Sequence, residues 1–166
     1  GVVPLSHNKL LTQCGLYTAD LIASLEHFSN EQNTYNRTGQ LELAISEARW
    51  QDLKRLHGSA KAYGGESYLL TPQESAEKMP LLDPNQIVGS LFVPAGMIVK
   101  GAHVTGALAR DAEAMGGAKF VGHTAMTDIE VKNGRVTAVL TNNPNMPRIE
   151  CENVLLAANI WAPALS

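Results

Sequence analysis

The chain has 166 residues, of which 45% are hydrophobic and 17% are charged, and this composition excludes a wholly disordered protein. Its 13 basic and 16 acidic residues are scattered in both signs, so we expect neither nucleic acid nor an anionic membrane surface as a partner. No segment approaches the roughly 20 apolar residues of a membrane span. The length suits one domain with a core of ordinary size, and a small molecule is the expected partner.

A helix is predicted from Lys9 to Phe28, because apolar residues recur there at steps of three and four. We expect the resulting stripe to pack against the rest of the fold; it consists of Leu10, Cys14, Tyr17, Leu21, Leu25 and Phe28. The polar residues 30–36 predict a turn. The alternation that begins at Gln40 and ends at Ile45 predicts a half-buried strand.

Two further helices have clear start signals. Ser46 is expected to cap a helix that continues to about Tyr63, where a pair of glycines ends it. Its packing face is expected to contain Trp50, Leu53, His57 and Ala60. The next helix begins after Thr71, because Pro72 and Glu74 complete the pattern of a capping box, and Pro80 ends it.

The middle of the chain predicts one strand and one helix. Residues 87–93 have the composition of a strand, which Pro94 ends. Gly101 to Met115 is expected to be helical, with apolar side chains on one face, and the glycine pair 116–117 supplies its end signal.

A hairpin and a buried strand are predicted in the last third. The alternating segments 126–131 and 135–141 flank Asn133 and Gly134, and an Asn-Gly pair readily adopts the positive φ angles of a tight hairpin turn. The uninterrupted apolar run from Val154 to Ala158 predicts a short strand of a parallel sheet, covered on both faces. Ligands bind at the carboxyl ends of such strands, so a site is expected just after Ala158.

Local chemistry by itself predicts no catalytic residue and no metal site. The five histidines share no ligand spacing with Cys, Asp or Glu. Cys14 and Cys151 show no CxxC spacing and predict buried thiols in a reducing compartment rather than a disulfide. No nucleophile elbow, phosphate loop or dinucleotide fingerprint is present.

The order of these elements, together with certain local sequences, resembles the D-amino-acid-oxidase-like family of FAD-dependent oxidoreductases, and within it the dimethylglycine and sarcosine dehydrogenases and oxidases. The resemblance is carried by Leu41 and Leu43, residues 70–74, residues 80–82, the strand 87–93 with Pro94, residues 134–136, and residues 157–161. It covers essentially the whole chain. It implies a mixed α/β (α+β) fold that forms part of an FAD-binding Rossmann-like domain with an interleaved substrate-side sheet and helices.

The resemblance also implies that residues 1–166 are a partial FAD-dependent domain. The family's dinucleotide fingerprint and its flavin-linking histidine would precede Gly1, so His7 is not that histidine, and the catalytic groups would follow Ser166. No catalytic residue is therefore assigned in this segment. The remainder of the same polypeptide is an expected partner.

Positions matching cofactor contacts of the family lie in three places. Val2 matches a residue just past the flavin-linking loop, and Met126 matches a position whose backbone pairs with the adenine edge. The third place is the strand-end loop near the pyrophosphate and ribose, matched by Ala157, Ala158, Asn159 and Trp161. The alternatives are core packing for Val2 and Met126 and interdomain packing for Trp161.

Two positions depart from the family pattern. Asn159 stands where the family commonly has Gly; Asn can adopt positive φ, but it adds a side chain where backbone nears phosphate. Ala95 and Gly96 replace an expected Asp-Gly turn.

The implied function is oxidation of an N-methyl amino acid, such as dimethylglycine or sarcosine, by hydride transfer to FAD in the cytoplasm or the mitochondrial matrix. One alternative is a related flavoenzyme acting on another amine, an amino acid or glycerol 3-phosphate. The other is a non-catalytic α+β module that has lost flavin, for which Asn159 is the argument.

Overall fold

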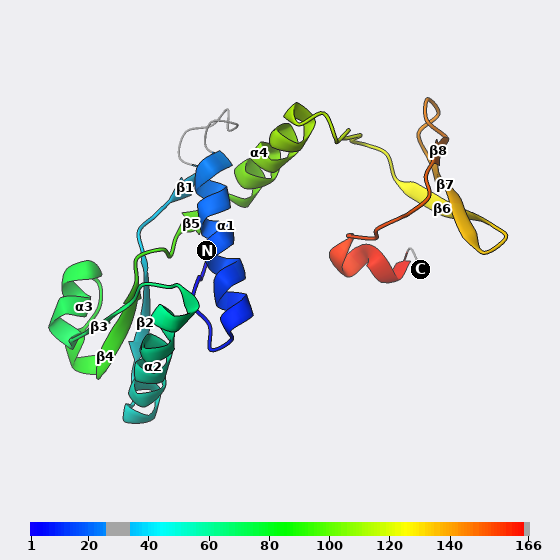
Figure 1. The fold of residues 1–166 in the computed structure, drawn as a ribbon. Coiled ribbons are helices and arrows are strands. Elements are labelled where there is room, and N and C mark those ends of the chain that lie inside the picture. The colour runs from blue at the N-terminus through cyan, green and yellow to red at the C-terminus, as the bar shows by residue number, and fades with distance from the viewer. Residues whose placement is uncertain (26–33, 165–166) are drawn as a thin grey trace. The chain divides into compact units, whose positions relative to one another are not determined.

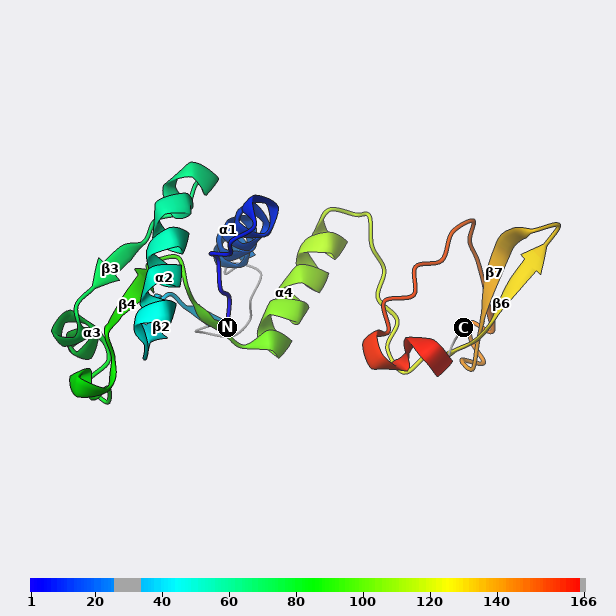
Figure 2. The ribbon, with the colours of Figure 1, turned by 90° about the horizontal axis from the view of Figure 1, so that it is seen from below.

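A computed structural model describes residues 1–25 and 34–164, which fall into two units, Gly1–Ala118 and Lys119–Ser166 (Figures 1 and 2). Phe28 and most of the predicted turn at 30–36 lie outside the described residues.

In its described residues, the first unit combines four helices with two small antiparallel sheets. One sheet has the strand order β2-β4-β3 and the other pairs β1 with β5. The elements are α1 Lys9–Ser24, β1 Tyr35–Asn36, β2 Gln40–Ala44, α2 Glu47–Ala60, β3 Tyr68–Leu70, α3 Pro72–Lys78, β4 Gly89–Val93, β5 Ile98–Val99 and α4 Gly101–Ala114, with 3₁₀ turns at Lys61–Tyr63 and Pro84–Gln86.

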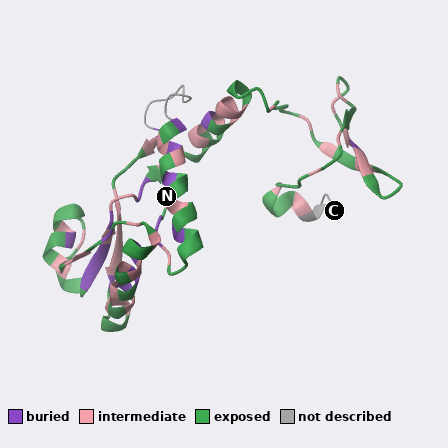
Figure 3. Ribbon diagram, in the orientation of Figure 1, coloured by how far each residue is buried: buried purple, intermediate pink, exposed green. Residues whose placement is uncertain are grey.

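The core of the first unit is the contact between α2 and the central strand β4. Leu91 and Val93 of β4 are 0% exposed and pack in one cluster with Leu53 and Leu56 of α2 (Figure 3). Because side chains alternate along a strand, Ser90 points to the other face of the sheet. There its hydroxyl lies 2.6 Å from that of Ser75 on α3.

The predicted helix starts are confirmed. The Ser46 side chain accepts a hydrogen bond from the Arg49 N–H group. At α3, Thr71 Oγ1 accepts from the Glu74 N–H at 3.2 Å, and Glu74 Oε2 accepts from the Thr71 N–H at 2.8 Å, which completes the capping box.

The predicted packing stripe of α1 is wrong for its first three members, whereas Leu25 is buried as predicted, with 2% of its surface exposed. Leu10 and Tyr17 are 66% and 68% exposed, and Cys14, expected to be buried, is exposed too. The helix instead turns a different face inward, where Gly15 lets Pro4 approach: a Cβ on Gly15 would lie 2.9 Å from Pro4 Cα. The buried residues of α1 are Thr12, Ala19 and Ile22.

The second unit contains the antiparallel sheet β6-β7-β8, with β6 at Met126–Lys132, β7 at Arg135–Thr141 and β8 at Arg148–Glu150. The predicted hairpin is confirmed. Asn133 and Gly134 have φ angles of 52° and 74°, and the register pairs Lys132 with Arg135. The positive angles at both residues are those of the tight turn that an Asn-Gly pair favours.

The predicted buried strand from Val154 to Ala158 is wrong for the part of the chain that the structure describes. These residues lie in no sheet there, and Leu155 is 91% exposed. A strand needs a neighbour to satisfy its backbone N–H and C=O groups. The described strands all pair antiparallel with one another, and their ladders do not reach this segment.

Within the described ranges, no helix is long and apolar enough to cross a membrane. Both cysteines are free thiols, and Cys151 is half-buried rather than buried.

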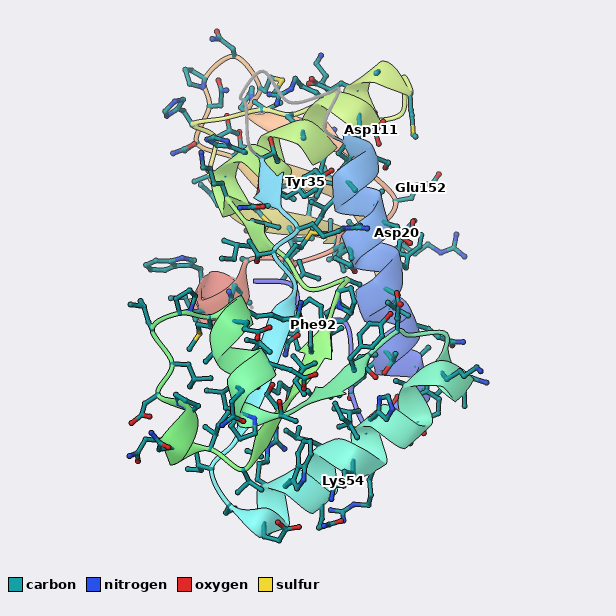
Figure 4. All side chains as sticks on the ribbon, turned by 90° about the vertical axis from the view of Figure 1, so that its left-hand side faces the viewer. Asp20, Tyr35, Lys54, Phe92, Asp111 and Glu152 are labelled. Carbon is teal, nitrogen blue, oxygen red and sulfur yellow. The ribbon has the colours of Figure 1, made fainter. Side chains whose placement is uncertain are left out.

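Gly39 is the position where the fold most clearly requires glycine. Its φ is 78°, and a Cβ there would lie 2.3 Å from Cε2 of Phe92, on the central strand β4 (Figure 4). We expect Gly39→Ala to lower the free energy of unfolding by at least about 1 to 2 kcal/mol, because a left-handed conformation is strained for L residues. Urea unfolding measures this change.

Gly58 provides the matched control. It lies inside α2, where a Cβ would meet no atom within 4 Å. Gly58→Ala should raise stability by up to about 1 kcal/mol, because Ala is the better helix former. Equal effects of the two substitutions would contradict the assignment of Gly39 as a constrained position.

Candidate cofactor site

Val2 lies in the first unit and forms an isolated bridge with Met97. The Val2 N–H donates to the Met97 carbonyl at 2.8 Å, and the Met97 N–H donates to the Val2 carbonyl at 3.3 Å. The half-buried Val2 side chain packs against the cluster around Met97. Because both its N–H and its carbonyl are used in the bridge, a cofactor contact at Val2 would involve the side chain.

Met126 begins β6 in the second unit, opposite Thr141. β6 is an edge strand of the described sheet, so one side of its backbone is left for other partners. A register shift between Met126 and Asp128 bends the strand at this point. An open backbone edge is what an adenine ring needs if it is to be bound through N–H and C=O groups.

The strand-end loop is also in the second unit. Ala157 and Ala158 lead into a 3₁₀ helix, Asn159–Ala164, seen in red in Figure 2. The Trp161 N–H donates to the Ala158 carbonyl at 3.0 Å. Asn159 has a φ of 49°, so the sequence-based expectation that Asn accepts the left-handed conformation here is confirmed.

The side chains of this loop are mostly open to solvent. Ile160 and Trp161 are 76% and 70% exposed, and Asn159 is exposed as well. Large apolar side chains that are this exposed mark a surface that binds a ligand or another part of a protein. Both interpretations of Trp161, as a cofactor contact and as a packing group, agree with its exposure.

The structure therefore assigns five of the six predicted cofactor residues to the second unit and Val2 to the first. A hollow of about 580 Å³ in the second unit is lined by the turn residues Gly134 and Arg135 together with Glu152. It lies at the turn end of the hairpin, whereas Met126 begins β6 at the opposite, open end. This hollow is thus separate from the predicted adenine contact.

Sequence reasoning missed a polar cluster that holds the hairpin together. Arg148 on β8 reaches across β7 to Glu130 on β6 at 2.9 Å and also pairs with Glu150 at 2.7 Å. Glu130 accepts a further hydrogen bond from the Thr137 hydroxyl at 2.5 Å. The hydrogen bond from Arg148 is the main reason why the pKa of Glu130 falls from 4.5 to about 2, with Thr137 the next contributor.

No simple sequence signal could have found this cluster. Glu130 and Arg148 are 18 residues apart, and a second register shift, between Glu130 and Val131, sets which residues meet. The absence of a metal site stays a prediction. Among the described residues, no group of three or more His, Cys, Asp or Glu side chains is placed to hold a metal ion.

The comparison with protein families decides the assignment. The family model described as "DAO: FAD dependent oxidoreductase" matches residues 2–166. The chain belongs to this family of FAD-dependent oxidoreductases. The resemblance identified from the sequence and the mixed α/β fold class are confirmed with it.

Curated members and relatives of the family are moderately similar. Mouse mitochondrial sarcosine dehydrogenase is 32% identical over 143 residues, which cover 83% of this chain and 15% of that protein. The mouse mitochondrial pyruvate dehydrogenase phosphatase regulatory subunit is 31% identical over 156 residues, which cover 94% of this chain and 17% of that protein. The chain thus spans less than a fifth of the length of these two relatives.

A solved structure shares the fold of this chain. The crystal structure of L-proline dehydrogenase from P. horikoshii matches with a TM-score of 0.86 and 21% identity, covering 99% of this chain and 42% of that one. At this identity the likeness concerns the fold of the FAD-dependent oxidoreductase family rather than its substrates.

The pKa of Glu130 predicts an acid-sensitive second unit. Because the folded pKa is depressed, the stabilisation from Glu130 is present above pH 4.5 and is lost as the pH falls from 4.5 towards 2. Glu130→Gln should lower stability at neutral pH and reduce this acid-dependent loss. Urea unfolding at several pH values, followed by hydrogen exchange of the backbone amides of residues 126–141, measures both.

Glu152→Gln is the matched control, since Glu152 is an exposed carboxylate of the same unit. It should leave both stability and its pH dependence unchanged. If Glu130→Gln behaved like Glu152→Gln, the cluster around Arg148 would not be stabilising.

Proposed function

We propose that this chain is part of a flavoenzyme that oxidises an N-methyl amino acid of the sarcosine or dimethylglycine type. The observation that carries the proposal is the family match over residues 2–166 combined with 32% identity to mouse sarcosine dehydrogenase over 83% of the chain. The 4-methylaminobutanoate oxidase of Paenarthrobacter nicotinovorans, whose name also describes oxidation of an N-methyl amine, is 26% identical over 94% of the chain.

In this proposal the chain's residues bind and orient FAD, and the flavin supplies the hydride acceptor. The open edge of β6 at Met126 would bind the adenine through backbone groups. Asn159, with its φ of 49°, would turn the backbone at the pyrophosphate, and Trp161 would lie beside it. Val2 would contribute its side chain from the first unit.

The exposed apolar run supports a domain completed by further polypeptide. Leu155 is 91% exposed and Leu156 38% exposed, although fully burying a Leu side chain is worth about 1.5 to 3 kcal/mol. We infer that the rest of the same polypeptide covers this run, with the dinucleotide fingerprint before Gly1 and the catalytic groups after Ser166. A flavin-linking histidine would lie in the preceding part.

A reducing compartment, either the cytoplasm or the mitochondrial matrix, fits this enzyme. Both cysteines are free thiols, and thiols persist where glutathione and thioredoxin keep them reduced. The sarcosine dehydrogenase and the phosphatase regulatory subunit that resemble this chain are both mitochondrial proteins.

A second candidate is a non-catalytic regulatory module. The phosphatase regulatory subunit is 31% identical over 94% of this chain, and its name describes regulation rather than oxidation. The side chain of Asn159, at a position predicted to approach phosphate, is the feature of this chain that favours a module without flavin. A flavoenzyme acting on another amine or amino acid is the alternative within the enzyme class.

The test is the visible absorbance of the purified full-length polypeptide. We expect a flavin spectrum that remains with the protein after acid precipitation, since a covalent link would retain it. Anaerobic addition of sarcosine or dimethylglycine should bleach the spectrum, whereas glycine and L-proline serve as control compounds. A colourless full-length protein would favour the regulatory module, and bleaching by L-proline alone would favour another substrate.

Substitutions at Asn159 test its place in the cofactor site. Asn159→Gly should retain or raise the flavin content, because Gly adopts positive φ without cost. Asn159→Val should lower it, since a left-handed conformation costs an L residue about 1 to 2 kcal/mol and a β-branched side chain is a genuine outlier there. The ratio of flavin to protein absorbance measures both.

Ile160→Val controls for general loss of folding, because Ile160 is a 76% exposed neighbour in the same 3₁₀ helix. Its flavin content should equal that of the unsubstituted protein. If Asn159→Val also kept full flavin content, Asn159 would lie outside the cofactor site.

A further inference from the structure

Helix α1 is apolar on two opposite faces. One face is buried in the first unit and contains Thr12, Ala19 and Ile22, with Gly15 against Pro4. The other face is the stripe predicted from the sequence, which we call the outer stripe and define as Leu10, Cys14, Tyr17 and Leu21. Three of these four are exposed, Leu10 at 66% and Tyr17 at 68%, and Leu11 beside them is 61% exposed.

Thr18 lies on one edge between these faces, where its hydroxyl donates to the Cys14 carbonyl at 2.7 Å, and the charged residues of α1 lie together with Gln13 on the opposite, polar edge. Lys9, Gln13 and Asp20 lie there, and Asp20 points away from the unit and pairs with Arg37 at 3.3 Å (Figure 4). A helix on the surface of a globular protein has one apolar stripe and a broad polar face, whereas a helix that is apolar nearly all round is buried. The pattern of α1 is that of a helix between two layers.

The outer stripe also has the composition of a permanent interface. Its residues carry no charge, and they follow one another at steps of four, three and four, so they form one continuous surface along the helix. Permanent interfaces resemble a protein core, while the centre of a transient one is surrounded by polar groups. The partner is therefore expected to be present whenever the protein is folded.

We propose that the outer stripe is covered by a layer of the same polypeptide that lies outside residues 1–166. This inference rests on the proposed function, in which the chain is one part of a longer FAD-dependent domain. The length of chain in the relatives supports it. The matched fold makes up 42% of the L-proline dehydrogenase chain and less than a fifth of the curated relatives, so much further polypeptide accompanies this fold in each.

Cys14 provides a built-in probe, because it lies in the middle of the outer stripe. The experiment uses the full-length polypeptide, kept dilute and monomeric. We expect a maleimide to label Cys14 at least about tenfold more slowly than it labels a cysteine on the polar edge of α1, because the layer that covers Cys14 must open before the thiol can react. The matched control is Gln13→Cys combined with Cys14→Ser, which presents a thiol from the adjacent position. Peptide mass mapping identifies the labelled residue.

A cross-link identifies what covers the stripe. Tyr17 is replaced by photoreactive p-benzoyl-L-phenylalanine in the full-length polypeptide, with the same replacement at Gln13 as the control. We expect irradiation to join position 17 to a peptide of the same molecule outside residues 1–166. Position 13 should give little or no such product.

Three results would overturn the proposal. The first is that the maleimide labels Cys14 as fast as it labels the control cysteine. The second is that Cys14 is protected only in an oligomer and position 17 cross-links to a second copy. The third is that position 17 cross-links to a peptide within residues 1–166. The flavin spectrum is recorded on the same samples, so loss of the proposed enzyme function is distinguished from loss of this interface.

Discussion

Burial of the central strand β4 is the interaction on which the first unit depends. Leu91 and Val93 are fully buried against α2, while the neighbouring Ser90 satisfies its hydroxyl with Ser75 of α3. A buried hydroxyl without a partner would cost free energy. The alternation of β4 therefore requires an apolar layer on one face and a small polar contact on the other, and this fixes where both helices lie.

The second unit depends less on an apolar core than on local geometry and charge. The left-handed angles of Asn133 and Gly134 turn the hairpin, and Arg148 joins the outer strands through Glu130. Among the described residues of this unit, Ala138 is the only buried apolar residue. A sheet with so small a core gains stability when another layer packs on it, which agrees with a role as one wall of a larger cofactor domain.

Exposed apolar surface connects the fold to the proposed function. Among the described residues, the apolar run 154–158 and the outer stripe of α1 both expose large apolar side chains to water, and this exposure costs free energy. Each lies in a different unit. Both are explained together if the chain is the middle of a longer FAD-dependent polypeptide, because a dinucleotide-binding domain offers apolar layers as well as a cofactor.

The sequence by itself determined the features that depend on neighbours within a few residues. Ser46, Thr71 and Glu74 marked the helix starts, and Asn133 and Gly134 marked the turn, because caps and turns are satisfied within one segment of chain. The order of the elements together with local sequences such as residues 70–74 and 157–161 carried the resemblance to the family. The tertiary structure alone decided which face of α1 is buried, since Gly15 can reveal its contact with Pro4 only once the two segments meet. It also decided that Val154 to Ala158 is not a strand among the described residues, because a strand exists only beside a partner. The charge cluster of Glu130 and Arg148 was hidden for the same physical reason: a register shift, and not the spacing along the chain, brings those two side chains together.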